Sequence, residues 1–343
     1  MLNILTTCLV LGAATFDAVG QNQHDAPTPR TPRTLDVTTN DSVPDGVELV
    51  ENATYYTAVG QGLTPRPLTF DAAYPTTFEG ERMPALIFMH GGGFVSGDKA
   101  QGRDFILSFA EGGYFAMSIE YRLATERPLP AATFDAAAAL RYLRTHADEL
   151  DIDPERIGLS GYSAGGHLAT LLATRGDRRS ETHVACAATI AAPTDLAELV
   201  RRDPTLEALI EAPEGKLDMV LKQLDPVTYI DANDPPIFLA HGEEDQTVEV
   251  EHMHRLARAL ESAGVPVTSQ CLNGTGHIVL DPQVYQDVAA FFDLHLGGKA
   301  EACVQRRVTT RLQGALRSWI DDAPPDVADD SVTVDAPDTP PVL

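Results

Sequence analysis

Residues 156–175 of the chain read RIGLSGYSAGGHLATLLATR. The first five residues have the length and apolar character of a buried strand, and the last twelve are expected to form a helix. Only a tight turn fits between the two, and Gly161 and Gly165 flank the serine in that turn because a Cβ at either position would clash. The segment therefore predicts a strand, a sharp turn and a helix. The Ser163 hydroxyl would stand at the helix N-terminus, where the helix dipole favours negative charge.

Strand and helix patterns alternate along the chain on both sides of this segment. The strands are expected at residues 50–59, 67–74, 84–90, 114–121, 156–160, 184–192, 236–241 and 265–271. The helices are expected at residues 99–111, 131–150, 164–175, 250–263 and 282–295. This alternation predicts an α/β fold with a mostly parallel central sheet and helices on both faces. In such a sheet, functional residues gather at the carboxyl ends of the strands.

A glycine-rich sequence, HGGGF at residues 90–94, follows the third expected strand. Acyl transfer needs N–H donors aimed at the position where a carbonyl oxygen becomes an oxyanion, and glycines let the backbone come close to that position. The expected donors are the backbone N–H groups of Gly92, Gly93 and Ala164. The residues expected to support this loop and the serine turn are His90, Gly91, Gly161 and Gly165.

The chain has ten histidines that are candidates for the base that takes a proton from the serine. His277 ends the Gly-rich sequence NGTGH after the last expected strand, which is where the base belongs when the chain order is serine, acid, histidine. His241 is expected only to end a strand. Four others are expected on helices, at the surface: His146, His252, His254 and His295.

The base needs a carboxylate to orient it and to stabilise the imidazolium. Asp245 ends the sequence HGEED after the preceding strand, 82 residues after Ser163 and 32 residues before His277. Its chain order and its position at a strand end both favour it for this role. The alternatives for this carboxylate are Asp195, Glu243 and Glu244.

From Val50 to about Leu296 the chain resembles the α/β-hydrolases of the esterase/lipase superfamily. The motifs that carry the resemblance are LIFMHGGGFVSGDK, EYRL, DPERIGLSGYSAGGHLA, DPVTYI and HGEEDQTV. They are most similar to the feruloyl/acetylxylan-type esterases and are related to the hormone-sensitive-lipase-like esterases. That second branch carries an N-terminal helical cap, which residues 21–49 do not predict because they lack helical periodicity.

The resemblance implies a serine carboxylic ester hydrolase that cleaves short-acyl or aryl esters through an acyl-enzyme, including esters attached to a carbohydrate. It assigns Ser163 as nucleophile, Asp245 as acid and His277 as base, and it implies no cofactor. A prolyl-oligopeptidase-like peptidase and a non-catalytic binding protein on the same fold are the alternatives. The insertion at 196–230 begins with an amphipathic helix, LAELVRRDPTLEALI. That helix is either a small lid over the site or an ordinary crossover.

The chain carries 50 Asp and Glu against 25 Lys and Arg, for a net charge of −25. Such acidity excludes a general nucleic-acid binder and argues against docking on an anionic membrane. It also disfavours anionic substrates. The partner that the resemblance implies is a small-molecule or polymer-linked ester substrate. The four cysteines lack metal-ligand spacing, so no metal site is expected. Cys186 is expected to be buried, and Cys271 and Cys303 could pair.

The ends of the chain differ in composition from its middle. Residues 1–20 are expected to be a signal peptide, because an apolar stretch precedes small residues, although the basic start is absent. The chain is then secreted or periplasmic, and cytoplasmic otherwise. The further expected parts are a disordered linker at 21–45, the catalytic domain at 46–298, a C-terminal helix at 299–320 and an acidic disordered tail at 321–343. The sequence predicts no oligomeric state.

Overall fold

The computed structural model describes residues 43–58, 65–176, 181–279 and 281–298. The expected signal peptide, most of the linker, the C-terminal helix and the acidic tail lie outside these residues. So does Cys303, and with it the expected pairing with Cys271. Within the described residues, Cys186 is buried as expected, and none of the helices there has the length and apolar character needed to cross a bilayer.

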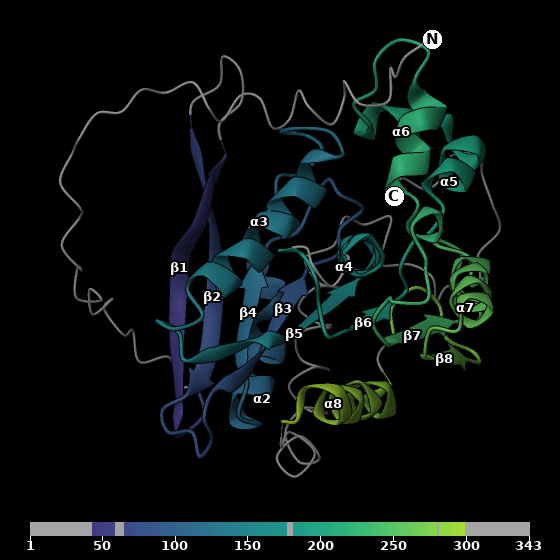
Figure 1. The fold of residues 1–343 in the computed structure, drawn as a ribbon. Coiled ribbons are helices and arrows are strands. Elements are labelled where there is room, and N and C mark those ends of the chain that lie inside the picture. The colour runs from purple at the N-terminus through teal and green to yellow at the C-terminus, as the bar shows by residue number, and fades with distance from the viewer. Residues whose placement is uncertain (1–42, 59–64, 177–180, 280, 299–343) are drawn as a thin grey trace, which may run out of the picture. The chain divides into compact units, whose positions relative to one another are not determined.

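Eight strands form one sheet in the order β1-β2-β4-β3-β5-β6-β7-β8 (Figure 1). The strands are β1 (Val47–Ala58), β2 (Arg66–Pro75), β3 (Met83–Met89), β4 (Phe115–Ile119), β5 (Ile152–Tyr162), β6 (Cys186–Ile190), β7 (Ile237–Gly242) and β8 (Val267–Leu272). The β1–β2 and β2–β4 pairs are antiparallel, and every pair from β4 across to β8 is parallel. The mostly parallel sheet predicted from the sequence is therefore confirmed.

Helices cover both faces of the sheet. The α-helices are α2 (Arg103–Glu111), α3 (Ala131–Thr145), α4 (Ala164–Arg175), α5 (Leu196–Arg202), α6 (Leu217–Leu224), α7 (Glu251–Ala263) and α8 (Pro282–Leu296). Shorter 3₁₀ helices are η1 (Lys99–Gly102), η2 (Pro204–Leu209) and η3 (Pro226–Thr228). One face packs against α3, α4 and α7, and the other packs against α2 and α8 (Figure 1).

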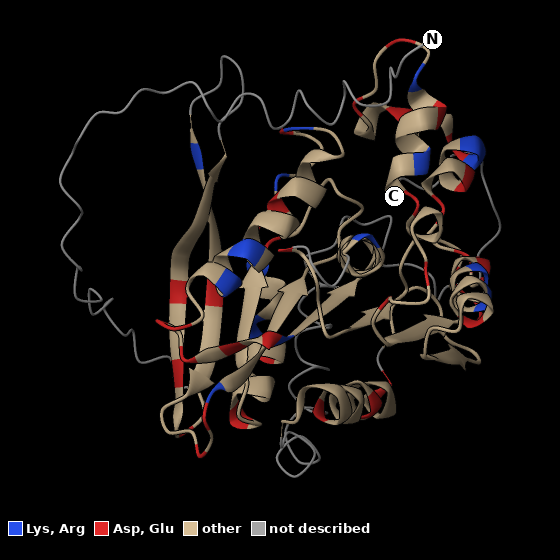
Figure 2. Cartoon of the chain, viewed as in Figure 1, with Lys and Arg blue, Asp and Glu red and all other residues tan. Residues whose placement is uncertain are grey.

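The central strands are buried from both sides, which explains their composition. Strands β3, β4, β6 and β7 contain no Asp, Glu, Lys or Arg, and nearly all their residues are buried. Acidic and basic side chains lie on the outer helices and on the edge strand β1 (Figure 2). A strand covered by helices on both faces has no solvent-exposed face, so its sequence is a continuous apolar run rather than an alternation of apolar and polar residues.

The amphipathic helix expected at 196–210 is not continuous, and that expectation is wrong. The structure splits the segment into α5 and η2, with the break between Asp203 and Pro204. Pro204 has no N–H to donate to the preceding turn, and its ring clashes with that turn. The Asp203 carboxylate accepts a hydrogen bond from the N–H of Thr205 at 3.0 Å and so starts η2.

A buried ion pair fastens the exit of β4 to α3. Asp135 is fully buried and accepts hydrogen bonds from the backbone N–H of Arg122 at 2.9 Å and from its Nε and Nη2 at 2.8 and 2.7 Å. Arg122 belongs to the EYRL motif. The guanidinium is largely buried too, so each charge depends on the other for its compensation.

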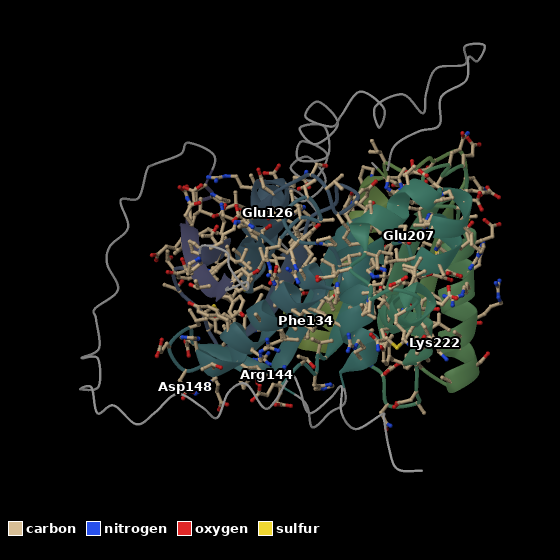
Figure 3. All side chains as sticks on the ribbon, turned by 90° about the horizontal axis from the view of Figure 1, so that it is seen from above. Glu126, Phe134, Arg144, Asp148, Glu207 and Lys222 are labelled. Atoms are coloured by element: carbon tan, nitrogen blue, oxygen red, sulfur yellow. The ribbon has the colours of Figure 1, made fainter. Side chains whose placement is uncertain are left out.

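Replacing Asp135 with Asn should lower the free energy of unfolding by about 3 kcal/mol, because a buried guanidinium then lacks its counter-charge. Urea denaturation would measure this. The matched control is Asp148→Asn, which removes an ion pair with Arg82 whose Asp148 side chain is 87% exposed (Figure 3). That variant should unfold as the wild type does. Equal losses in the two variants would contradict the argument.

Candidate active site

Ser163 occupies a strained turn between β5 and α4. Its φ of 51° lies in the left-handed region, where a residue with a side chain costs of order 1–3 kcal/mol. Its N–H donates to the carbonyl of Ile190 at 2.9 Å, which ties the turn to β6. A Cβ on Gly161 would stand 2.3 Å from the carbonyl oxygen of Gly165, so the turn closes only with glycine there.

Three of the residues predicted from the sequence are hydrogen-bonded in series. His277 Nδ1 lies 2.7 Å from Asp245 Oδ2, and His277 Nε2 lies 2.9 Å from Ser163 Oγ. A carboxylate only accepts, so Nδ1 carries the proton and Nε2 is free to accept from the serine hydroxyl. The three residues are 3–7% exposed, so these contacts are shielded from water.

The loops that carry Asp245 and His277 are held against each other and against the serine turn. A Cβ on Gly242 would stand 2.2 Å from the carbonyl oxygens of Thr275 and Gly276, so the acid loop and the base loop are in direct backbone contact. The Tyr162 hydroxyl donates to the backbone carbonyl of His277. His277 is therefore held in position both by the acid loop and by Tyr162, the residue that precedes Ser163.

The Asp245 carboxylate is surrounded by donors. Oδ1 accepts from the N–H groups of Thr247 and Val248, each at 2.9 Å. Oδ2 faces both His277 Nδ1 and the Nε2 of His241, the latter at 3.0 Å. Burial raises the pKa of this carboxyl, but the hydrogen bonds from His241 and His277 outweigh burial and hold the pKa well below its usual range. Asp245 is therefore ionised whenever the protein is folded near neutral pH.

The alternative carboxylates lie elsewhere. Asp195 begins α5, where its side chain accepts from the N–H of Glu198 at 2.9 Å and lies 3.6 Å from Arg255 Nε. Glu243 and Glu244 are exposed on the loop that ends in the buried Asp245. Only Asp245 contacts His277 among the candidates for the acid.

Hydrogen bonds hold the carbonyl groups of the glycine loop and so fix the direction of the N–H groups that follow them. His90 Nδ1 donates to the carbonyl of Gly91 at 2.7 Å, and the Ser96 N–H and hydroxyl donate to the carbonyl of Gly92 at 3.0 and 3.1 Å. In a trans peptide the N–H points opposite to the carbonyl. The N–H groups of Gly92 and Gly93 therefore point away from these partners. A Cβ on Gly91 would lie 3.4 Å from the Ser163 Cβ, so the loop packs directly on the serine.

His90 is a prop for this loop. Its ring stacks on Tyr121 with centroids 4.2 Å apart, and the Tyr121 hydroxyl donates to the His90 carbonyl at 2.8 Å. Burial lowers the pKa of His90 to about 4. The ring is thus neutral near pH 7, with its proton on Nδ1 facing the Gly91 carbonyl, and it lies outside the proton path from Ser163 to Asp245.

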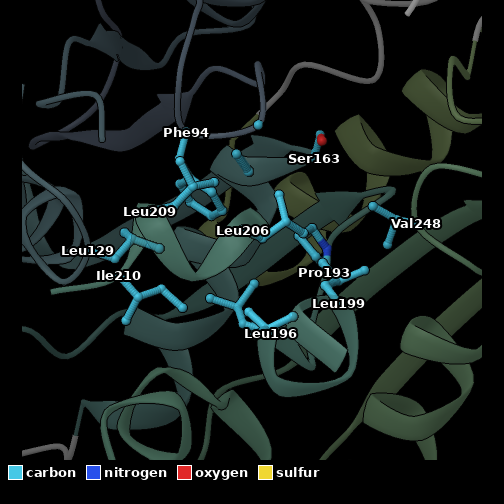
Figure 4. Close-up of a pocket in the computed structure, with 13 residues that line it drawn as sticks. Phe94, Leu129, Ser163, Pro193, Leu196, Leu199, Leu206, Leu209, Ile210 and Val248 are labelled. Atoms are coloured by element: carbon cyan, nitrogen blue, oxygen red, sulfur yellow. The ribbon is translucent and has the colours of Figure 1, made fainter. Parts of the chain in front are cut away.

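An apolar pocket of about 470 Å³, its open mouth included, adjoins Ser163 (Figure 4). It is lined by Gly93, Phe94, Leu129, Ser163, Ala164, Pro193, Leu196, Leu199, Val200, Leu206, Leu209, Ile210 and Val248. Six of these residues come from α5, η2 and the residue that follows η2. The insertion between β6 and β7 therefore forms a small lid over the pocket, which was one of the two interpretations of that segment.

A backbone strap joins the lid to the loop before α3. The Leu129 N–H donates to the carbonyl of Leu209, and the Glu211 N–H donates to the carbonyl of Leu129, both at 2.8 Å. Outside the strap, Arg127 and Glu211 form an exposed ion pair at 2.7 Å. The far wall of the pocket is therefore closed by paired backbone rather than by side chains alone.

His252 anchors the other side of the lid. Its Nδ1 accepts hydrogen bonds from the N–H groups of Thr194 and Asp195, both at 3.1 Å, and its Nε2 lies 3.3 Å from Glu198 Oε2. The expectation of a surface histidine is wrong, because His252 faces the first residues of the lid and is buried by them. Burial lowers the pKa of His252, in keeping with an unprotonated Nδ1.

Sequence reasoning missed several residues that shape the site. Tyr162, Tyr121, His241 and His252 each contact a predicted site residue or the segment that holds one. Tyr162 had a usable signal, because it immediately precedes the serine. Tyr121 and His252 act across long sequence separations, and His241, four residues before Asp245, belongs to no local pattern that marks its role. Among the described residues, no group of three or more His, Cys, Asp and Glu side chains is arranged to hold a metal ion.

A sequence profile of the BD-FAE family matches residues 70–260, which is more than half of the chain. The chain belongs to the BD-FAE family. The matched region contains the glycine loop, the serine turn, the lid and the acid loop, so the BD-FAE family covers every part of the site except the base loop.

Curated relatives of this BD-FAE chain carry esterase and lipase names. Lipase 2 of Moraxella sp. is 44% identical over 90 residues, which cover 26% of this chain and 21% of that protein. The probable carboxylic ester hydrolase LipM of Mycobacterium tuberculosis is 32% identical over 189 residues, which cover 49% of this chain and 42% of that protein. The chain thus spans less than half the length of either relative.

Solved structures extend the likeness of this BD-FAE chain to the whole catalytic fold. Esterase 2 of Thermogutta terrifontis, with propionate bound, is 28% identical, with a TM-score of 0.60 over 74% of this chain and 95% of that one. A truncated carbohydrate esterase from gut microbiota has a TM-score of 0.62 over 73% of this chain and 96% of that one, at 24% identity. The second comparison supports the fold alone.

The acid stability of this BD-FAE domain should depend on His167. Its ring is buried beside Phe94 and donates from Nδ1 to the Pro193 carbonyl at 2.7 Å, and burial lowers its pKa to about 4. Between pH 6.5 and 4 the unfolded chain binds more protons, so stability falls as the pH falls through that window. His167→Asn keeps a donor at the Nδ1 position but cannot titrate. Between pH 6.5 and pH 4 its free energy of unfolding should therefore fall by up to about 3 kcal/mol less than that of the wild type.

Chemical denaturation at pH 7 and pH 4 would measure this difference. The control His167→Leu removes both the titration and the hydrogen bond, so it should be less stable at pH 7 yet show the same reduced pH dependence as His167→Asn. A wild-type pH dependence in both variants would show that His167 is not the group responsible.

Proposed function

We propose that this chain is a serine carboxylic ester hydrolase that works through an acyl-enzyme. The observation that carries the proposal is the buried hydrogen-bonded series Ser163–His277–Asp245, on which the glycine loop packs. The esterase and lipase names of its relatives agree with this activity. A non-catalytic binding protein is disfavoured, because nucleophile, base and acid are all present in bonding geometry.

Acylation begins with the serine hydroxyl. His277 Nε2 takes the Oγ proton as Oγ bonds to the ester carbonyl carbon, and the carbonyl oxygen becomes an oxyanion. The N–H groups of Gly92, Gly93 and Ala164 hold that oxyanion. The bond to the alcohol oxygen then breaks, the Nε2 proton passes to the departing alkoxide, and an acyl-serine remains.

Deacylation runs the same steps with water. His277 Nε2 takes a proton from a water molecule whose oxygen attacks the acyl carbonyl, and the same N–H groups hold the second oxyanion. The bond to Ser163 Oγ breaks and His277 returns the proton to Oγ, which releases the carboxylic acid. Asp245 is ionised throughout and stabilises the imidazolium that forms in both halves.

The pocket favours esters with an uncharged, apolar acyl group of short to medium length. Its walls are Leu, Ile, Val, Phe and Pro side chains, and its volume is small. The bound propionate in the Thermogutta terrifontis esterase agrees with a short acyl group. The alcohol side of the ester faces the open mouth, where an aryl, small or carbohydrate-linked group has room. Export to the cell exterior or the periplasm is a proposal that depends on residues 1–20 alone.

Replacing Ser163 with Ala should lower kcat/KM for p-nitrophenyl acetate by about 10³-fold or more, since the acyl-enzyme cannot form. A fluorophosphonate probe should label the wild type and leave the variant unlabelled. Ser160→Ala is the matched control, because Ser160 is the other serine of the same motif and lies inside β5. Undiminished turnover by folded Ser163→Ala protein would refute the proposed function.

Replacing Ile210 with Trp should fill the part of the pocket next to the Leu129 strap. The kcat/KM ratio of p-nitrophenyl hexanoate to acetate should fall by about tenfold, because the longer acyl chain loses its room while acetate still fits. Met219→Trp on the lid is the control, since Met219 is 47% exposed and does not line the pocket. If folded Ile210→Trp protein keeps the wild-type ratio of kcat/KM for hexanoate to acetate, the acyl group does not bind in this part of the pocket.

A further inference from the structure

His241 ends strand β7 as a fully buried imidazole. Its Nε2 lies 2.7 Å from the carbonyl oxygen of Val248 and 3.0 Å from Asp245 Oδ2. A carbonyl oxygen only accepts, so Nε2 carries a proton and shares it between the two oxygens. Its Nδ1 is buried without a hydrogen-bond partner among the described residues. The Nε2 proton of the ring is therefore aimed at the acid loop.

Asp245 is held on several sides before His277 is counted. Its Oδ1 accepts hydrogen bonds from two backbone N–H groups at 2.9 Å, and its Oδ2 accepts a hydrogen bond from His241 Nε2 at 3.0 Å. His277 Nδ1 reaches the same oxygen at 2.7 Å. Two imidazoles thus share one carboxylate oxygen, and only one of them contacts the serine.

We propose that His241 is a positioning residue for the reaction. By donating to Oδ2, it fixes the orientation of the Asp245 carboxylate and shares the negative charge that this oxygen offers to His277. This inference deepens the proposed function and rests on it. His241 has no contact with the serine, and its one contact with a pocket residue is to the backbone carbonyl of Val248, so it acts through Asp245 and the Val248 backbone.

The sharing has a predictable sign. A hydrogen-bond donor on Oδ2 draws charge away from the contact with His277, so the imidazolium formed there is less stabilised than it would be beside a carboxylate without that donor. Without that donor, His277 holds its proton to a higher pH. The other ionisable groups near His241 are His277, His252 on α7 and Cys271, its register partner on β8.

The test compares two substitutions at one position in the full chain. His241→Phe keeps the ring size and removes the donor, whereas the side-chain amide of His241→Gln can occupy the Nε2 position and donate. For His241→Phe, kcat for p-nitrophenyl acetate should fall by about tenfold, while KM stays within about threefold of the wild-type value. The acidic limb of the pH profile of kcat/KM should move to higher pH by about half a pH unit or more. His241→Gln should keep the wild-type limb and most of kcat.

A second measurement does not depend on turnover. An NMR titration of ¹⁵N-labelled histidine should give a higher protonation midpoint for the His277 ring in His241→Phe than in the wild type or in His241→Gln. Circular dichroism melting would show that each variant is folded. If His241→Phe does not fold, His241→Asn replaces it, because its shorter amide cannot reach the Nε2 position.

Two outcomes would overturn the inference. One is a folded variant that lacks the donor and yet keeps the wild-type acidic limb of kcat/KM and the wild-type protonation midpoint of His277. The other is an equal loss of kcat in His241→Gln and His241→Phe with no shift of the limb, which would indicate that His241 only packs the loop. A wild type that neither hydrolyses esters nor reacts with fluorophosphonate would refute the proposed function, and the NMR midpoint would still test His241 separately.

Discussion

The close approach of helix α4 to the end of strand β3 determines how the glycine loop lies against the serine. A Cβ on Gly165 would stand 2.0 Å from the carbonyl oxygen of Met89, so the helix and the strand meet with backbone against backbone. That contact places the glycine loop, which starts at His90, directly on Ser163. The helix N-terminus and the glycine loop then both adjoin the serine, which is what stabilisation of an oxyanion by preorganised dipoles would need. A single side chain at position 165 would separate the two halves of that arrangement.

The parallel sheet supplies the remaining members. Ser163 follows β5, Asp245 follows β7 and His277 follows β8, and the carboxyl ends of parallel strands share one edge. Residues 114 positions apart in the chain therefore meet without any long excursion. The loops themselves are short and bonded to one another, as where the Glu244 N–H donates to the Thr275 carbonyl at 2.9 Å. Positional precision in the site thus comes from strand register, with loop contacts that remove the remaining freedom.

What the sequence could predict follows from where each signal resides. The strands, the serine turn and the glycine loop are encoded within a few neighbouring residues, so apolar runs and glycine spacing identified them. The break in the lid at Pro204 was also local, and it was overlooked because the apolar spacing continues through it. His241 and His252 could not be assigned in this way. His252 Nδ1 accepts hydrogen bonds from backbone N–H groups 57 and 58 positions away, and His241 contacts Asp245, four residues on, only because the acid loop folds back on the end of β7. A single sequence holds no record of such contacts.

The acid loop also supplies one residue of the pocket wall, Val248. The Val248 side chain lines the pocket. Its N–H donates a hydrogen bond to Asp245 Oδ1 at 2.9 Å, and its carbonyl accepts one from His241 Nε2. Burying an ionised carboxylate is costly unless its lone pairs are filled, and this loop fills them with backbone donors that a side-chain substitution does not remove. The arrangement therefore separates two demands on one segment. Pocket shape depends on the side chain at position 248, while the state of Asp245 depends on the backbone there and on His241.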